Sequence, residues 1–260
     1  MSKFFKIAIV GAGNVGWHLA RALEDAGHCV TDIYSRRITT ARELAQRLYD
    51  TNVTSSLNLS KSEAEIFLLA VTDDVLEEVS AKLEIPPYAT IAHTSGTQSL
   101  EVLSEHHEHS GIFYPLQTFT KGVSVDLKDV PICIEAVHQS TEKVLYSLGN
   151  SISDEVYTVH SDDRKVLHVA AVFAGNFGNY MLTIAQDILE DHDIDFGLLH
   201  PFIVETVNKA LTVGPWESQT GPAQRGDTRT IQNHLKFLRN EPKYRKIYKL
   251  LSDQLKESYS

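Results

Sequence analysis

The chain has 260 residues, which is long for one domain and predicts between one and two domains. Hydrophobic residues make up 42% and charged residues 22%, a composition that argues against a disordered or fibrous protein. Lysine and arginine total 24 against 34 acidic residues, so the net charge is −10. Such an acidic balance makes general binding to nucleic acid or to an anionic membrane unexpected.

The two cysteines, Cys29 and Cys133, lie in apolar runs that resemble strands, so we expect buried thiols and no disulfide framework. No metal site is expected, since the histidine-rich stretch 106–109 lies in a polar connection whose side chains point in different directions. No secretory signal is visible, and we expect a cytoplasmic protein. Segment 166–185 is apolar enough for a membrane span but holds one histidine and two asparagines, which favour a buried helix in a soluble domain.

The first part of the chain alternates short apolar runs with helical patterns. Apolar runs typical of strands occupy residues 4–10, 29–34, 66–71, 90–93, 111–114, 130–134 and 156–159. Helical patterns occupy residues 14–26, 39–48, 74–83, 100–106 and 140–148. This alternation predicts an α/β fold of the Rossmann type, a doubly wound and mostly parallel sheet with helices on both faces. The strands are apolar nearly throughout, as strands covered on both faces should be.

The pattern changes near residue 159, because no convincing strand follows. Helical patterns occupy residues 161–191, 195–212, 228–239 and 243–258, and the loop 213–227 is rich in glycine and proline. We therefore predict an α/β domain over residues 1–159 and an all-α domain over residues 160–260 that binds substrate and forms a dimer.

The segment Gly-Ala-Gly-Asn-Val-Gly at residues 11–16 matches the pattern G-x-G-x-x-G. It directly follows a strand and opens a helix, which is the context that a dinucleotide-binding turn requires. The glycines permit a tight turn, close approach of a pyrophosphate and close helix–strand packing, with the phosphates on free N–H groups of the helix. A glycine turn without a ligand is the alternative. The contacts with the cofactor are assigned to Gly11, Gly13, Asn14, Val15 and Gly16.

The end of the second strand selects the cofactor, because an acidic side chain there would bind the ribose hydroxyls of NAD. This chain instead has Ser35, Arg36 and Arg37. A small hydroxyl and two guanidiniums suit a 2′-phosphate, which arginine can bind through two hydrogen bonds. The sequence therefore favours NADP (NADPH) over NAD, and two solvated arginines at a helix start are the alternative.

Later segments resemble known families. Residues 71–74, Val-Thr-Asp-Asp, resemble the turn beneath the nicotinamide ribose in pyrroline-5-carboxylate reductases and 3-hydroxyacid dehydrogenases. Residues 93–96, His-Thr-Ser-Gly, lie where those enzymes have a substrate-facing Ser/Gly loop. Residues 114–119 and 220–227 together resemble Rossmann-like proteins that carry a helical C-terminal domain of unknown function, number 2520.

This resemblance spans nearly the whole chain. It implies a fold similar to the 6-phosphogluconate dehydrogenase superfamily, with a C-terminal domain of that helical type, and dimers formed through the helical domain. It implies cofactor contacts from Val71 and Thr72, and substrate contacts from Ser95, Gly96 and Gln117. Apolar side chains that one helix does not need also favour a homodimer, namely Phe202, Ile203, Val207 and Leu211.

Residues that could supply a proton lie on the long helical segment 161–191. His168 and Asn176 are two turns apart on one face of an α-helix, and histidine is suited to proton donation at neutral pH. The hydroxyacid dehydrogenases place a lysine and an asparagine on this helix, and Lys165 lies one turn before His168. The acid is therefore unsettled between His168 and Lys165, with Asn176 orienting the substrate. A hydrogen-bonded core histidine is an equally good interpretation of His168.

The segment 220–227 holds a second candidate group. Asp227 is a good N-cap for the following helix, and Arg225 near a helix N-terminus could bind an anion such as a substrate carboxylate. An internal Arg–Asp pair in a capped loop is nearly as good an interpretation.

The leading hypothesis is an NADP-dependent oxidoreductase that transfers hydride between nicotinamide and a C=O or C=N carbon of a small, carboxylate-bearing molecule. The alternative is a dinucleotide-binding regulatory or redox-sensing protein without turnover, because fold does not establish function.

Overall fold

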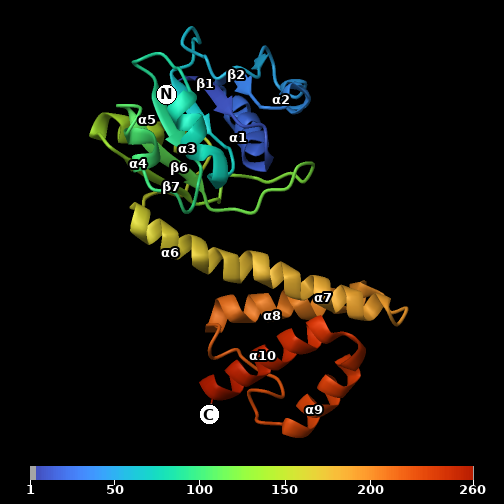
Figure 1. Ribbon diagram of the computed structural model, residues 1–260. Coiled ribbons are helices and arrows are strands. Elements are labelled where there is room, and N and C mark those ends of the chain that lie inside the picture. The colour runs from blue at the N-terminus through green and yellow to red at the C-terminus, as the bar shows by residue number, and fades with distance from the viewer. Residues whose placement is uncertain (1–3, 260) are drawn as a thin grey trace. The chain divides into compact units, whose positions relative to one another are not determined.

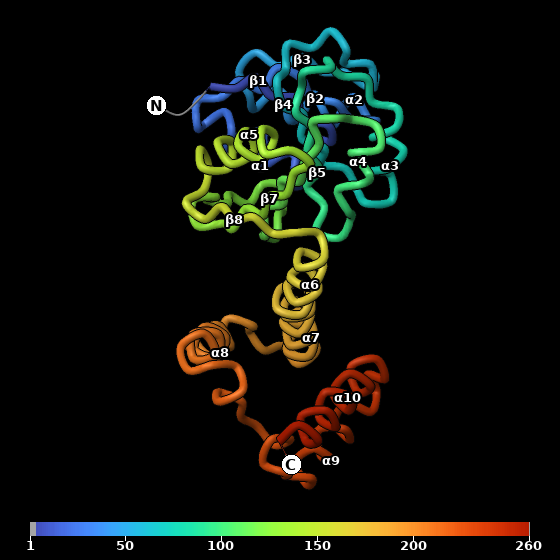
Figure 2. Tube along the Cα trace, turned by 90° about the vertical axis from the view of Figure 1, so that its left-hand side faces the viewer, coloured from blue at the N-terminus to red at the C-terminus, as the bar shows by residue number. Residues whose placement is uncertain are grey.

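The computed structural model describes residues 4–259 and divides into two compact units, Met1–Asn176 (unit 1) and Phe177–Ser260 (unit 2). Unit 1 is a twisted sheet with helices on both faces, and unit 2 consists of helices (Figure 1). The colour ramp of Figure 2 shows that each unit is formed by one continuous stretch of chain.

Within residues 4–259 the sheet has eight strands in the order β3-β2-β1-β4-β5-β6-β7-β8. All neighbours are parallel except β6 and β7, which are antiparallel. The order reverses between β1 and β4, which makes their carboxyl ends the topological switch point of the sheet. The strands are β1 (Lys6–Val10), β2 (Cys29–Tyr34), β3 (Asn52–Thr54), β4 (Ile66–Leu69), β5 (Thr90–His93), β6 (Ser110–Pro115), β7 (Ile132–Ala136) and β8 (Val156–Thr158).

Side-chain alternation along β1 assigns the helices to two faces of the sheet. Ile7 and Ile9 pack under α1 (Asn14–Asp25), α2 (Ile38–Ala45) and α5 (Gln139–Gly149). Ala8 and Val10 belong to the opposite core, under α3 (Asp73–Lys82) and α4 (Glu101–Ser104). Both faces are therefore covered, which explains why these strands are apolar nearly throughout.

Unit 1 ends with α6 (Ser161–Ala171) and most of a π-helix, η1 (Val172–Phe177). Unit 2 contains α7 (Gly178–Glu190), the 3₁₀ turn η2 (Phe196–Leu199), α8 (His200–Val213), α9 (Thr228–Phe237), the 3₁₀ turn η3 (Leu238–Asn240) and α10 (Pro242–Ser258). A stacked pair, Trp216 on Tyr259 with ring centroids 4.2 Å apart, joins the loop after α8 to the end of α10. In residues 4–259 no helix is long and apolar enough to cross a membrane.

The α/β fold with a helical C-terminal part is confirmed, and two local differences from expectation have physical causes. The short strand β3 was not predicted, because its three residues are exposed or half-buried and two of them are polar. The predicted single helix over residues 161–191 is interrupted by η1, where backbone bonds run from i to i+5. Gly175 lies inside η1 and Gly178 directly follows it, and glycine lowers the cost of leaving α geometry.

The two thiols are free, as expected, but only Cys133 is buried, whereas Cys29 is half-buried. The domain boundary predicted near residue 159 coincides with the end of the last strand, β8. The two compact units instead meet later, at Asn176 and Phe177, inside the long helical segment. The difference arises because α6 packs against the sheet through buried side chains, among them Arg164.

His93, at the end of β5, is completely buried and held at both ring nitrogens. Its Nδ1 accepts a hydrogen bond from the Ser95 N–H at 3.2 Å, and its Nε2 donates to the Ser99 carbonyl at 3.2 Å. Burial lowers the pKa of His93 to about 4, and the positive charge of Arg164 adds to the effect. The neutral ring therefore fixes the loop that follows β5.

We predict that His93 makes the fold less stable in acid. In the unfolded chain a histidine has a pKa near 6.5, so below that pH the unfolded state binds a proton that the native state excludes until about pH 4. The free energy of unfolding should therefore fall by roughly 3 kcal/mol between pH 7 and pH 4 because of this one residue. Urea unfolding of the wild type and of His93→Gln across this range measures the difference, and parallel pH profiles would contradict it.

Candidate dinucleotide and proton-transfer site

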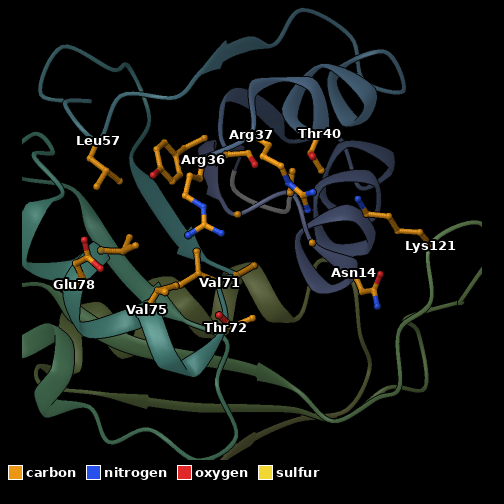
Figure 3. A pocket seen from close by; sticks show the side chains of 17 residues that line it. Asn14, Arg36, Arg37, Thr40, Leu57, Val71, Thr72, Val75, Glu78 and Lys121 are labelled. Atoms are coloured by element: carbon orange, nitrogen blue, oxygen red, sulfur yellow. The ribbon is translucent and has the colours of Figure 1, made fainter.

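A cavity of about 530 Å³ lies at the switch point, at the carboxyl ends of β1, β2 and β4 (Figure 3). It is lined by the glycine turn after β1, by residues 34–37 at the end of β2, and by residues 70–72 after β4. This volume is within the range of small-molecule and cofactor sites, and the position is where open α/β sheets bind ligands.

The three glycines of the turn differ in how closely other backbone atoms approach them. A Cβ on Gly16 would lie 1.9 Å from the Gly11 carbonyl oxygen, and a Cβ on Gly11 would lie 2.4 Å from the Ala70 oxygen. Gly11 also has φ of 116°, a conformation that favours glycine. Gly13 is exposed and lines the cavity, and the nearest atom to its Cβ position is the Ala70 oxygen at 3.9 Å. The protein's own packing therefore requires Gly11 and Gly16, whereas at Gly13 the backbone faces open space.

The two arginines that the sequence predicts as cofactor contacts line this same cavity. Arg36 and Arg37 are exposed, and Figure 3 shows the Arg36 guanidinium inside the cavity above Val71. Of residues 4–259, no carboxylate lies within 4.0 Å of either guanidinium. The one acid in the lining, Glu78, is paired with Lys82 at 2.6 Å. Both guanidiniums are therefore available to an anionic ligand.

The turn, the open space beside Gly13 and the two guanidiniums fit a dinucleotide with an additional phosphate. The N-terminus of α1 points its first N–H groups at the turn, where a pyrophosphate would accept them. Asn14, Ser35 and the turn residues Val71 and Thr72 complete the lining, and Val15 lies on the buried side of α1. A residue that the sequence did not select, Lys121, also lines the cavity.

The loop after β5 lies beside the turn after β4. The Thr97 hydroxyl donates to the Asp73 carboxylate at the start of α3, which joins the two loops. Ser95 is buried, and its Oγ accepts hydrogen bonds from the N–H groups of Thr97 at 3.1 Å and Gln98 at 3.0 Å. Ser95 therefore shapes this loop.

His168 of α6 contacts the same loop and the end of β6. Its Nδ1 is hydrogen-bonded to the Tyr114 hydroxyl at 3.0 Å. A Cβ on Gly96 would lie 2.4 Å from Nδ1, so the imidazole packs directly on this glycine. Burial raises the pKa of the Tyr114 phenol, which therefore stays protonated at neutral pH. The structure thus brings His168, Gly96 and Tyr114 together at the carboxyl edge of the sheet.

A buried ion pair fixes α6 against the sheet one turn before His168. Arg164 is completely buried, and its Nη1 donates to Glu135 Oε2 of β7 at 2.8 Å. Its Nη2 donates to the Gln98 carbonyl, and the Ser161 hydroxyl donates to Glu135 at 2.6 Å. Breaking such a pair leaves a buried charge uncompensated, at a cost of roughly 3–5 kcal/mol. This anchor keeps the His168 ring in place.

Lys165 and Asn176, the other two side chains that the sequence selects for catalysis, are both exposed. Lys165 pairs with Asp162 at 3.5 Å and lines a separate polar hollow with Ser99 and Glu135. Asn176 lies in η1, between α6 and α7.

Gln117 follows β6 and is exposed, with its Oε1 accepting the Thr118 N–H at 2.7 Å.

In unit 2, Asp227 caps α9: one oxygen accepts the Thr230 N–H at 3.0 Å and the other accepts the Thr230 hydroxyl at 2.7 Å. These hydrogen bonds lower the pKa of Asp227. Arg225 is exposed and, within the described chain, has no carboxylate within 4.0 Å. Arg225 therefore keeps its donors available for an anion, whereas both oxygens of Asp227 are occupied by Thr230.

Sequence reasoning missed three residues that the structure brings to these sites, Tyr114, Lys121 and Arg164. Tyr114 lies next to the carboxyl end of its strand, a signal that could have selected it. Arg164 lies four residues before His168, and no local pattern indicates that it is buried. Lys121 lies in a long loop, where the sequence carries no signal of its position.

Two family models match the chain. Residues 2–117 match a Rossmann-like domain, and residues 130–255 match the domain of unknown function 2520. No protein with curated annotation has a significantly similar sequence.

Solved structures cover nearly the whole chain. A Bacteroides fragilis protein provisionally described as an NADP oxidoreductase is 35% identical, with 98% of both chains covered and a TM-score of 0.90. A Thermotoga maritima protein is 20% identical, with 97% of this chain and 98% of that chain covered and a TM-score of 0.68. A reductive aminase from Aspergillus terreus, solved with NADPH, is 12% identical, with 98% and 94% covered and a TM-score of 0.70. The last two likenesses show the fold alone.

We predict that Gly13 and Gly16 separate binding from folding. Gly13→Ala should leave the melting temperature nearly unchanged but raise the Kd for NADPH at least roughly tenfold, because its methyl group enters the space for the pyrophosphate. Gly16→Ala should destabilise the fold by several kcal/mol, because its methyl group would overlap the Gly11 carbonyl. Thermal unfolding and fluorescence titration measure both. Unchanged NADPH affinity in Gly13→Ala would contradict the assignment of the cavity.

Proposed function

The chain belongs to the family of the Bacteroides fragilis protein, a Rossmann-like domain followed by the domain of unknown function 2520, and on this premise we propose that it is an NADP-dependent oxidoreductase. It transfers hydride between nicotinamide and a C=O or C=N carbon of a small, carboxylate-bearing molecule. The observation that carries the proposal is the cavity at the switch point, which combines the open backbone at Gly13 with the guanidiniums of Arg36 and Arg37.

NADP is preferred over NAD for electrostatic reasons. The side chains at the end of β2 are a hydroxyl and two guanidiniums, and a 2′-phosphate gives such guanidiniums an anionic partner that the NAD ribose lacks. The description of the Bacteroides fragilis protein as an NADP oxidoreductase supports the same preference.

His168 is the proton donor in this proposal. The bound nicotinamide supplies the hydride that the substrate carbon accepts. The oxygen or nitrogen of the former double bond must then gain a proton, and imidazolium is suited to give one at neutral pH. The Tyr114 hydroxyl holds Nδ1, which leaves Nε2 as the nitrogen that delivers the proton. Lys165, paired with Asp162, is the less favoured donor.

The remaining side chains have positioning roles. Ser95 and Gly96, in the loop that contacts His168, and Gln117, which follows β6, are candidate substrate contacts, and Asn176 is a further candidate to orient the substrate. In unit 2, Arg225 is a candidate ligand for an anion such as a carboxylate, because it keeps free donors, whereas the Asp227 carboxylate is engaged at the helix cap.

We expect NADPH oxidation with at least one member of a panel of 2-keto acids and cyclic imines, followed by absorbance at the nicotinamide band. His168→Ala should lower kcat by roughly 100-fold or more while leaving NADPH affinity unchanged. Tyr114→Phe should lower kcat by about tenfold, because one hydrogen bond to the donor is lost.

Two controls make the assay decisive. The double variant Arg36→Ala/Arg37→Ala should weaken NADPH far more than NADH, and equal weakening would overturn the cofactor assignment. Tight NADPH binding without turnover over the whole panel would instead favour a regulatory or redox-sensing protein.

The protein acts as a homodimer through unit 2 in this proposal. Phe202, Val207 and Leu211 of α8 are exposed, at 68%, 52% and 81% respectively, and Ile203 is half-buried. A contiguous apolar surface of this kind is typical of a protein–protein contact. Light scattering should give twice the mass of one chain, and Leu211→Glu should give a monomer. A wild type that is monomeric at micromolar concentration would contradict the proposal.

A further inference from the structure

The loop that connects β6 to β7 brings a third basic group to the dinucleotide cavity. Lys121 lies in this loop, more than eighty residues along the chain from Arg36 and Arg37, yet its side chain lines the same cavity. Figure 3 shows Lys121 entering from the side opposite Leu57 and Glu78, with its amine directed toward Arg37 and Thr40.

Contacts with α1 hold the loop in this position. The His18 Nε2 donates to the Thr120 carbonyl at 3.0 Å, and the His18 ring stacks on Phe119 with centroids 4.9 Å apart. Both side chains are buried, at 8% and 9% exposure. The two residues that precede Lys121 are therefore fixed to the helix that follows the glycine turn.

The Lys121 side chain is held by the same helix. Its Nζ lies 5.1 Å from the centroid of the Trp17 ring, a distance typical of a cation–π contact. In the described part of the chain no carboxylate lies within 4.0 Å of this amine. A lysine that is half-buried, restrained and without an acidic partner has donors available for a phosphate, and its restraint reduces the entropy lost on binding.

The charge of the cavity also favours this assignment. The whole chain carries a net charge of −10, but the charged side chains in the lining are Arg36, Arg37, Lys121 and one acid, Glu78, which is paired with Lys82. In Figure 3, Glu78 and Leu57 lie on the opposite side of the cavity from Lys121, whereas Arg37 and Thr40 lie on the same side as Lys121. The basic end of the cavity is thus built from the connection between β2 and α2 and from the β6–β7 loop.

We propose that Lys121 binds the 2′-phosphate of NADP together with Arg37 and is a cofactor-selecting residue. This proposal rests on the proposed function, since it requires a dinucleotide in the cavity. The ammonium donates hydrogen bonds to phosphate oxygens, and the guanidinium of Arg37 binds the same group from the other side. Selection of NADP therefore depends on two parts of the chain, and the β6–β7 loop must be seated on α1 for the site to be complete.

The experiment measures binding of four probes to the full chain by calorimetry: NADPH, NADH, adenosine 2′,5′-bisphosphate and 5′-AMP. Lys121→Met, which keeps the length of the side chain, should raise the Kd of NADPH and of the bisphosphate roughly tenfold. Its effect on NADH and 5′-AMP should stay within about twofold. Lys121→Arg should restore most of the affinity, because the positive charge is retained.

Lys128→Met is the matched control, because Lys128 lies in the same loop, pairs with Asp154 at 3.6 Å and does not line the cavity. It changes the net charge equally and should leave all four affinities unchanged. Equal weakening of NADPH and NADH in Lys121→Met would put the amine on the pyrophosphate and overturn the assignment, as would no weakening at all. Failure of the wild type to bind either dinucleotide would instead overturn the proposed function itself.

Discussion

The close packing of the first helix on the first strand is the constraint on which the cavity depends. A Cβ on Gly16 would overlap the Gly11 carbonyl, and a Cβ on Gly11 would overlap the Ala70 carbonyl of the neighbouring chain segment. These contacts bring the N-terminus of α1 and the carboxyl ends of β1 and β4 to one point. The first N–H groups of the helix, the open backbone at Gly13 and the residues after β2 can then face a single ligand.

A second set of contacts organises the other end of the carboxyl edge. His93 stays neutral because burial opposes its charge, and it fixes the loop that carries Ser95 and Gly96. Arg164 reaches from α6 to Glu135 and to the Gln98 carbonyl of the same loop. His168 therefore has a defined place on Gly96 and Tyr114. In the proposed reaction, His168 would thus be positioned by the neutral Tyr114 phenol and the Gly96 loop before substrate binds, as efficient proton transfer requires.

The electrostatics of the protein are local, and the net charge carries little information about the ligand. The chain as a whole is acidic, whereas an anionic ligand in the cavity would meet a small cluster of basic groups. The acid in that cavity is paired with Lys82, and the carboxylate of Asp227 in unit 2 is engaged by Thr230. The acid in the cavity is thus occupied, and the guanidiniums of Arg36 and Arg37 are left available.

Local patterns in the sequence determined the strands, most helices and the dinucleotide turn, because apolar periodicity and glycine spacing act between residues close in the chain. The short polar strand β3 and the π-helix η1 carry no such pattern and were not predicted. Only the tertiary structure decided which distant groups meet: Tyr114 with His168, Arg164 with Glu135, and Lys121 with the arginines after β2. The path of each loop sets these contacts, and that path depends on packing against elements that lie far away in the sequence.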